Sequence, residues 1–231
     1  MAIKLYDLAG AEEDRRFSPN CWRTRMALAH KGLAVETIPW RFVEKAAIAA
    51  SGQGAVPVIV DEDKTVFDSW TIANYLEDRY PDRPSLFGGA AGRALARFVN
   101  NWTHAVVYPG LFRMIVKDIW DHVDAKDRDY FRQSREQRLG TTLERTVADR
   151  DAKIVAFRAS LQPLRITLEA QPFLGGAASN YADYSVFGGF QWARCISPFK
   201  ILGDGDPVAA WRQRLLDAFD GLAGKSKGYT C

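Results

Sequence analysis

The sequence has few of the features that mark secreted, metal-binding or membrane-embedded chains. Its 231 residues include only three cysteines, Cys21, Cys195 and Cys231, which are odd in number and far apart. This spacing argues against a disulfide framework and against a CxxC zinc site. No stretch approaches the roughly 20 apolar residues that a membrane-spanning helix needs, and the first residues lack the apolar segment of a secretory signal. We therefore expect a protein of a reducing compartment, the cytoplasm, with no membrane partner.

The sequence also lacks a large excess of positive or negative charge. The 31 basic residues are nearly balanced by 28 acidic ones, for a net charge of +3, and no dense basic run suggests a nucleic-acid partner. The three histidines, His30, His104 and His122, show no metal-ligand spacing, so we expect no metal site and treat each as a surface or packing residue. The hydrophobic fraction of 47% is ample for a core, and the length fits two modest domains or one large one.

The first eighty residues alternate between strand and helix patterns. We expect a small sheet with helices packed on it, because short β-branched runs alternate with helical periodicity. The predicted elements are a strand at Ile3–Leu8, a helix from Ser18 to Lys31, a strand at Val35–Ile38, a weak helix at Glu44–Ala50, strands at Val56–Val60 and Thr65–Phe67, and a helix at Trp70–Tyr80 that Ser69 caps.

The segment Pro81–Pro84 is the clearest break, and almost no strand pattern follows it. We predict an α/β domain at residues 1–80, a linker at 81–88 and an all-helical bundle domain at 89–231. Its expected features are a helix at Arg93–Val107 that stops before Pro109, a helix at Leu111–Trp120, a charged and solvated stretch at Asp121–Arg138, one long helix over Leu143–Leu168 kinked at Pro163, a capping box at Asn180–Asp183 and a last helix at Pro207–Leu222.

The segment Ser18–Leu28 (SPNCWRTRMAL) organises the candidate chemistry. Ser18 is a suitable N-cap, and Pro19 fits the first helical position. Trp22 marks the buried face of this helix, whereas Arg23 is expected to project elsewhere. A hydroxyl at a helix N-terminus lies beside unpaired N–H groups, where an anion such as a thiolate would be stabilised. The alternative is that Ser18 only caps its helix.

Two further pairs lie in order behind Ser18. Val56-Pro57 precedes a strand, and a proline there indicates either a cis peptide or an edge strand. A cis bond would turn the Val56 N–H and C=O toward an extended peptide ligand. Asp68-Ser69 ends a strand and opens a helix, where Ser69 offers a carboxylate site and Asp68 an acceptor for an ammonium group. Capping is the alternative role of this second pair.

Together these motifs make the N-terminal part resemble the thioredoxin-like domain of glutathione transferases. The resemblance rests on Ser18–Arg25, Val56-Pro57 and Asp68-Ser69, and the Asn180–Asp183 box resembles the capping box of the family's helical domain. Within the family the chain looks most like the bacterial beta-etherase branch and its fungal relatives, partly through Ser134–Arg138. That branch cleaves beta-aryl ethers in lignin-derived compounds with glutathione.

The resemblance implies a homodimer that binds glutathione as co-substrate at the sheet edge. Asp68 and Ser69 would hold the γ-glutamyl amine and carboxylate, and Val56, presented by Pro57, would pair with the cysteinyl backbone. Ser18 would donate a hydrogen bond to the sulfur as the main catalytic group. We rank Asn20, a second donor from the same turn, below it.

The other glutathione contacts stay open at this stage. Trp40, Arg41 and Lys45 are candidates for binding the glycine carboxylate. Cys21 is a rival nucleophile, because a cysteine in the first turn of a helix has its pKa lowered by the dipole. Against this, free cysteines are usually buried, and the thioltransferase-type relatives carry cysteine at the Ser18 position.

The electrophile site is expected to face the helical domain. Aromatic and apolar residues around Pro109 would form its walls, although such stripes are also typical of a core: Trp102, Tyr108, Phe112, Ile115 and Trp120. The expected reaction is attack of the glutathione thiolate on an aromatic or aryl ether electrophile, with beta-aryl ether cleavage first. The alternatives are a general xenobiotic-conjugating transferase and a non-catalytic carrier of aromatic ligands.

Overall fold

The computed structural model describes residues 2–230 and begins with a mixed four-stranded sheet. The strands are β1 (Ile3–Leu8), β2 (Val35–Trp40), β3 (Val58–Asp61) and β4 (Lys64–Phe67), in the spatial order β2-β1-β3-β4. Strand β2 runs parallel to β1, whereas β3 and β4 are antiparallel to their neighbours. A parallel pair requires a crossover, which helix α1 (Pro19–His30) supplies. This is the predicted thioredoxin-like arrangement.

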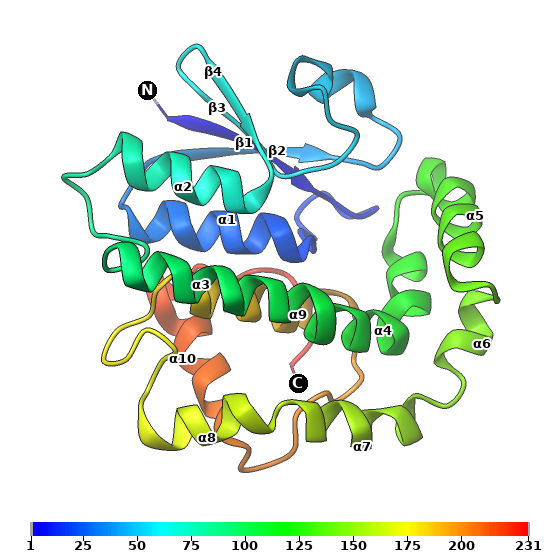
Figure 1. Ribbon diagram of the computed structural model, residues 1–231. Helices are drawn as coiled ribbons and strands as arrows, with labels where there is room; N and C mark the ends of the chain where they lie inside the picture. Colours follow the sequence, from blue (N-terminus) through cyan, green and yellow to red (C-terminus); the bar gives the residue numbers. More distant parts are fainter. Residues whose placement is uncertain (1, 231) are drawn as a thin grey trace.

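Helices α1 and α2 (Ser69–Arg79) lie between the sheet and the helical part of the chain (Figure 1). The buried face of α1 includes Trp22, as predicted, but Arg23 is also fully buried. Its guanidinium donates a hydrogen bond of 2.5 Å to Asn100 Oδ1. Hydrogen bonding to a side chain of the helical part makes burial of this charge tolerable.

The start of α2 differs from the sequence-based prediction. Asp68, not Ser69, is the N-cap: its carboxylate accepts a hydrogen bond of 2.9 Å from the Thr71 N–H. Ser69 is the first helical residue. An aspartate caps a helix as readily as a serine, so the local sequence allowed either assignment.

The Val56–Pro57 peptide bond is cis. Strand β3 begins two residues later than predicted, at Val58, and it pairs with β1 on one side and β4 on the other. The proline therefore precedes an inner strand, and the edge-strand alternative is wrong.

The helical part opens with a continuous rod instead of two separate helices. Helix α3 (Ala90–Trp102) passes through the π-helical turn η2 (Thr103–Val107) into α4 (Tyr108–His122). The predicted stop before Pro109 is wrong, because this proline lies in the first turn of α4, where a missing N–H is tolerated.

The charged stretch after α4 is not simply solvated. It contains the short turn η3 (Ala125–Asp127) and helix α5 (Arg128–Leu139), with Phe131 buried. Asp127 is fully buried. Its carboxylate accepts hydrogen bonds of 3.0 Å from the Phe42 and Val43 N–H groups, which offset the cost of burying its charge. A local count of charge could not reveal this tertiary contact.

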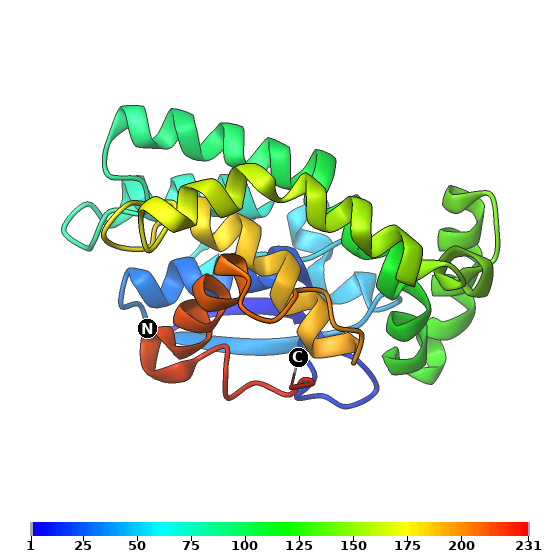
Figure 2. The ribbon, with the colours of Figure 1, turned by 90° about the horizontal axis from the view of Figure 1, so that it is seen from below.

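The long periodic run is three helices instead of one. They are α6 (Leu143–Val147), α7 (Arg150–Ser160) and α8 (Gln162–Ala170), and Pro163 lies in the first turn of α8. Figure 2 shows α7 and α8 following one another as a band, with α5 and α6 set apart at one side.

Helix α9 (Tyr181–Ile196) is the centre of the helical part and packs against α1. Its predicted capping box is confirmed: Asn180 Oδ1 accepts from the Ala182 N–H at 2.9 Å, and Asp183 Oδ2 accepts from the Asn180 N–H at 3.0 Å. A Cβ on Gly188 would lie 2.3 Å from the Pro19 carbonyl oxygen, so glycine permits the close approach of α9 to the start of α1. Helix α10 (Pro207–Gly221) packs on α8 and α9.

Candidate active site

A cavity of about 550 Å³ lies between the N-terminus of α1 and the helices α4 and α5. Its volume is in the usual range for a small-molecule site. The walls come from the start of α1, the end of β2, the loop before β3, and α4, α5 and α9. Aromatic and basic side chains dominate the helical side, and no aspartate or glutamate of the described residues lines the cavity.

Ser18 lies at the N-terminus of helix α1 and lines this cavity. It has the extended backbone of an N-cap, and its Oγ accepts a hydrogen bond of 3.2 Å from the Cys21 N–H. A hydroxyl carries one donor hydrogen as well as its acceptor lone pairs. Capping therefore leaves the Ser18 O–H free to donate to an anion in the cavity, and the two readings of this residue are compatible.

Cys21 does not line the cavity. It is fully buried, and its Sγ lies 3.9 Å from the Tyr6 carbonyl oxygen. Burial, followed by the nearby charge of Asp7, raises the pKa of this thiol well above its ordinary value. A thiol held protonated in the core is a poor nucleophile, so the structure argues against the rival hypothesis.

Four of the sequence-predicted residues surround the Ser18 end of the cavity. Asn20, Trp40 and Val56 line it, and Pro57, the next residue after Val56, is buried. The amide oxygen of Asn20 is buried and has no hydrogen-bond partner among residues 2–230.

The predicted pair Asp68 and Ser69 lies beside the cavity instead of in its wall. The Asp68 side chain is exposed, and the Ser69 carbonyl accepts a hydrogen bond of 2.6 Å from the Tyr181 hydroxyl. Asp68 is near enough to His104, a cavity residue, for its charge to raise the pKa of that histidine. Asp68 and Ser69 lie at the N-terminus of α2, adjacent to the cavity.

Of the three candidates for binding a second carboxylate, two are already engaged. The Trp40 indole N–H donates to the Glu44 carbonyl oxygen at 2.8 Å. Arg41 Nε lies 3.1 Å from Asp124 Oδ2. Lys45, by contrast, pairs with no carboxylate of the described chain, and its Nζ lies 5.2 Å above the Tyr130 ring, which lines the cavity.

The predicted aromatic wall is present only in part. Tyr108 and Phe112 line the cavity, whereas Trp102 and Ile115 do not, and Ile115 is fully buried in the core. Trp120 also lies outside. Other wall residues were not predicted from the sequence and come from η2, α4, α5 and α9: His104, Arg113, Tyr130, Phe131, Arg135, Arg138 and Trp192.

Comparison with known families identifies the family of the chain. Residues 14–84 match the N-terminal domain model of glutathione S-transferases, and residues 94–216 match a C-terminal domain model of the same enzymes. The chain belongs to the glutathione S-transferase family. This confirms the prediction that glutathione is the co-substrate.

Solved structures agree with this assignment along nearly the whole chain. A glutathione transferase of Phanerochaete chrysosporium, GSTFuA3, is 27% identical, with a TM-score of 0.83 over 96% of this chain and 97% of that one. The glutathione S-transferase CsGST63524 of Ceriporiopsis subvermispora, solved in complex with glutathione, is 25% identical, with a TM-score of 0.82 over 95% and 97%.

Curated relatives match over a shorter stretch. A maleylacetoacetate isomerase of Pseudomonas aeruginosa is 33% identical over 100 residues, which cover 40% of this chain and 47% of that protein. Glutathione S-transferase Z2 of Arabidopsis thaliana is 28% identical over 111 residues, covering 46% and 50%. The matched stretches thus span about half the length of these relatives.

His104 is the wall residue that the sequence analysis had assigned to the surface or the packing. Desolvation, followed by the positive charges of Arg23 and Arg97, lowers its pKa to about 4. The imidazole is therefore neutral near pH 7. A signal was present in the sequence, because His104, Tyr108 and Phe112 are spaced by four residues and so share one helical face.

The other two histidines are structural. His30 Nδ1 lies 2.7 Å from the Tyr184 hydroxyl, and His122 Nε2 lies 2.9 Å from the Tyr229 hydroxyl. Among residues 2–230, no group of three or more His, Cys, Asp or Glu side chains is placed to hold a metal ion. No helix in the same range is long and apolar enough to cross a membrane.

Proposed function

We propose that the chain is a glutathione-dependent transferase in which the cavity binds the glutathione sulfur beside Ser18. The observation that carries this proposal is the opening of the Ser18 hydroxyl, at the N-terminus of α1, into the same cavity as Val56 and the aromatic wall. A thiolate placed there would meet both a free O–H donor and the positive end of a helix dipole.

The main catalytic task is to stabilise the thiolate, because a free thiol with a pKa of about 8.5 is mostly protonated at neutral pH. A hydrogen bond to an ionised group contributes about 1.5–3 kcal/mol, which lowers the thiol pKa by roughly one to two units. Ser18 supplies this bond, and Asn20 is the second candidate donor from the same turn.

The family resemblance suggests three of the remaining glutathione contacts, and the lack of an ion-pair partner suggests the fourth. Val56 pairs with the cysteinyl backbone behind the cis Pro57, and Asp68 and Ser69 take the γ-glutamyl amine and carboxylate. Lys45 takes the glycine carboxylate, because Trp40 and Arg41 already have partners. In this proposal residues 1–80 form the glutathione-binding domain, 81–88 the linker and 89–231 the electrophile domain.

We propose an aryl ether as the electrophile, held against Tyr108 and Phe112. The thiolate sulfur attacks the carbon that bears the aryloxy group. The new carbon–sulfur bond forms as the carbon–oxygen bond breaks, and the departing phenolate keeps the electron pair and takes up a proton. Beta-aryl ether cleavage is the specific form of this reaction that the resemblance of Ser18–Leu28 and Ser134–Arg138 to beta-etherases favours.

We also propose that the protein is a cytoplasmic homodimer. The side chains of Leu95 and Phe98 on α3 are 69% and 70% exposed, and they lie one helical turn apart. Large apolar side chains that cluster on a surface helix are typical of an interaction face.

Phenol release from a model beta-aryl ether, with and without glutathione, tests the reaction. We expect glutathione-dependent release that Ser18→Ala reduces about 10- to 100-fold and Ser18→Thr partly restores, with a higher pKa of the bound thiol in Ser18→Ala. Since Ser18 is also a cap, thermal unfolding of both variants separates lost stability from lost chemistry. No release despite glutathione binding would contradict ether cleavage and favour conjugation of other electrophiles or transport of aromatic ligands.

A further inference from the structure

The electrophile end of the cavity is strongly basic. Three arginines line it, Arg113 from α4 and Arg135 and Arg138 from α5, and none of them forms an ion pair with an Asp or Glu among residues 2–230. Other arginines of the region are paired: Arg132 with Glu136 and Glu144, and Arg150 with Asp118. The cavity therefore holds positive charge that the protein itself does not neutralise.

These arginines are also tied to the aromatic wall. The Arg138 guanidinium lies 4.5 Å from the Phe112 ring centroid, and Phe112 stacks on Trp192 at 6.0 Å with 21° between the ring planes. The Arg135 guanidinium lies 4.7 Å from the Phe131 centroid. Stacking on aromatic faces fixes the planar guanidinium groups, so their N–H donors are oriented before a ligand arrives.

A continuous row of ring contacts joins the basic end to the rest of the cavity. His104 contacts Tyr108 at 5.1 Å between centroids, Tyr108 contacts Trp192 at 6.2 Å, and Trp192 stacks on Phe112 below Arg138. An aromatic ligand that lies along this row would present its far end to the guanidinium groups.

Like charges lie close together at the basic end, where Arg135 is half-buried and Arg113 and Arg138 are exposed. Burial, followed by the like charge of Arg138, lowers the pKa of the Arg135 guanidinium. Two like charges three residues apart on α5 repel each other, and neither forms an ion pair with a carboxylate in the described part of the chain. A bound carboxylate would relieve the repulsion and would accept charge-assisted, bidentate hydrogen bonds.

We propose that the electrophile of this cavity is an aromatic acid, whose carboxylate is bound by Arg135 and Arg138, with Arg113 of α4 lining the same cavity. This inference rests on the proposed function, because it names the substrate class of the same site. An uncharged aromatic compound would fill the aromatic row but would leave the three guanidinium groups without a counter-charge.

A matched pair of ligands tests the proposal without any turnover. 2-Naphthoate and 2-naphthamide have the same ring and differ in charge, and calorimetry or tryptophan quenching reports their binding to the full chain. We expect the acid to bind about tenfold tighter than the amide at pH 7, and this preference to shrink at high ionic strength. Equal affinity of the two ligands would overturn the proposal.

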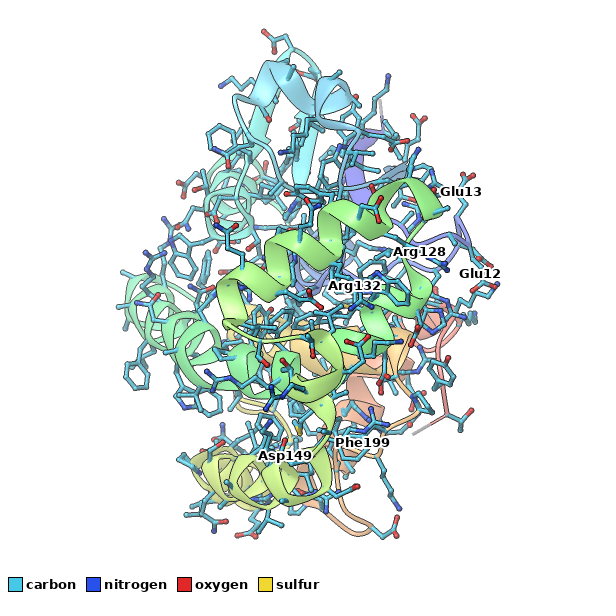
Figure 3. All side chains as sticks on the ribbon, turned by 90° about the vertical axis from the view of Figure 1, so that its right-hand side faces the viewer. Glu12, Glu13, Arg128, Arg132, Asp149 and Phe199 are labelled. Atoms are coloured by element: carbon cyan, nitrogen blue, oxygen red, sulfur yellow. The ribbon has the colours of Figure 1, made fainter. Side chains whose placement is uncertain are left out.

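Variants assign the effect to the cavity. Arg135→Gln and Arg138→Gln should each weaken naphthoate about tenfold and leave naphthamide unchanged, which also shows that the pocket is intact. Arg128→Gln is the control, because Arg128 is on the same helix but lies over the Trp120 ring, 5.2 Å from its centroid, outside the cavity. Figure 3 shows the labelled Arg128 and Arg132 extending from α5. An equal loss in Arg128→Gln would overturn the assignment.

The same variants distinguish the aromatic acid from glutathione itself. If Arg135 or Arg138 bound the glycine carboxylate, its variant would weaken glutathione and not naphthoate, and this result would overturn the proposal. Naphthoate selectivity without phenol release would mean that the proposed ether cleavage is wrong and the acid site is right. Phenol release without a preference for naphthoate over naphthamide would mean that the proposed ether cleavage is right and the acid site is wrong.

Discussion

The guanidinium of Arg23 and the amide oxygen of Asn100 lie 2.5 Å apart and join α1 to α3 in the interior of the protein. Arg23 is fully buried and Asn100 is 5% exposed. Arg23 also donates to the Tyr108 hydroxyl, which lines the cavity. One buried cation thus ties the helix that carries Ser18 to the wall of the electrophile site.

Asn100→Ala should lower the free energy of unfolding by about 2 kcal/mol, because it leaves a buried charged donor without its acceptor. Urea unfolding measures this loss. Gln133→Ala is the control: this side chain is exposed on α5, so its removal should stay within about 0.5 kcal/mol of the wild type. Equal losses in the two variants would show that the Arg23 contact carries no special weight.

His104 should titrate far below an ordinary histidine. NMR should place its midpoint at about pH 4, because desolvation and the charges of Arg23 and Arg97 oppose protonation in the folded protein. Asp68→Asn should lower the midpoint further, since the Asp68 charge raises it, and Arg97→Gln should increase it. A midpoint near 6.5, the ordinary histidine value, would contradict the structure.

The lowered pKa of His104 also makes the free energy of unfolding depend on pH. An unfolded chain protonates this histidine near pH 6.5 and the folded chain only near pH 4, so the unfolded state binds more protons between these values. The contribution of His104 is therefore complete above pH 6.5 and is lost as the pH falls toward 4. His104→Gln should lose less stability than the wild type over that interval.

Phe98→Glu should convert the proposed dimer to a monomer, because a charge placed in an apolar interface cannot be solvated there. Sedimentation velocity measures the mass. Val155→Glu is the control, since Val155 is 69% exposed on α7, a different helix. A wild-type mass of one chain, or equal masses of all three proteins, would refute the proposed interface.

Local chemistry made two positions in the cavity wall and the capping box of α9 predictable from sequence. Ser18, Val56-Pro57 and the Asn180–Asp183 box are each specified by the residues next to them, since capping and proline geometry depend on adjacent backbone. Arg135 and Arg138 were not predictable in the same way. Their segment is dense in charge with few apolar residues, and only the placement of α5 beside α4 makes these side chains part of a cavity wall.

Lys45 is proposed to bind the glycine carboxylate of glutathione, because Trp40 and Arg41 already have partners. Lys45→Met should weaken glutathione roughly two- to fivefold, which is what loss of an exposed ion pair of up to about 1 kcal/mol gives. Calorimetry with glutathione and with its glycine monoethyl ester isolates the contact: the ester lacks the carboxylate, so it should bind the wild type and Lys45→Met equally. Arg41→Met is the control, because it breaks the ion pair with Asp124 and should reduce stability without changing the preference for glutathione over the ester. If Arg41→Met abolished that preference and Lys45→Met did not, the glycine carboxylate would belong to Arg41.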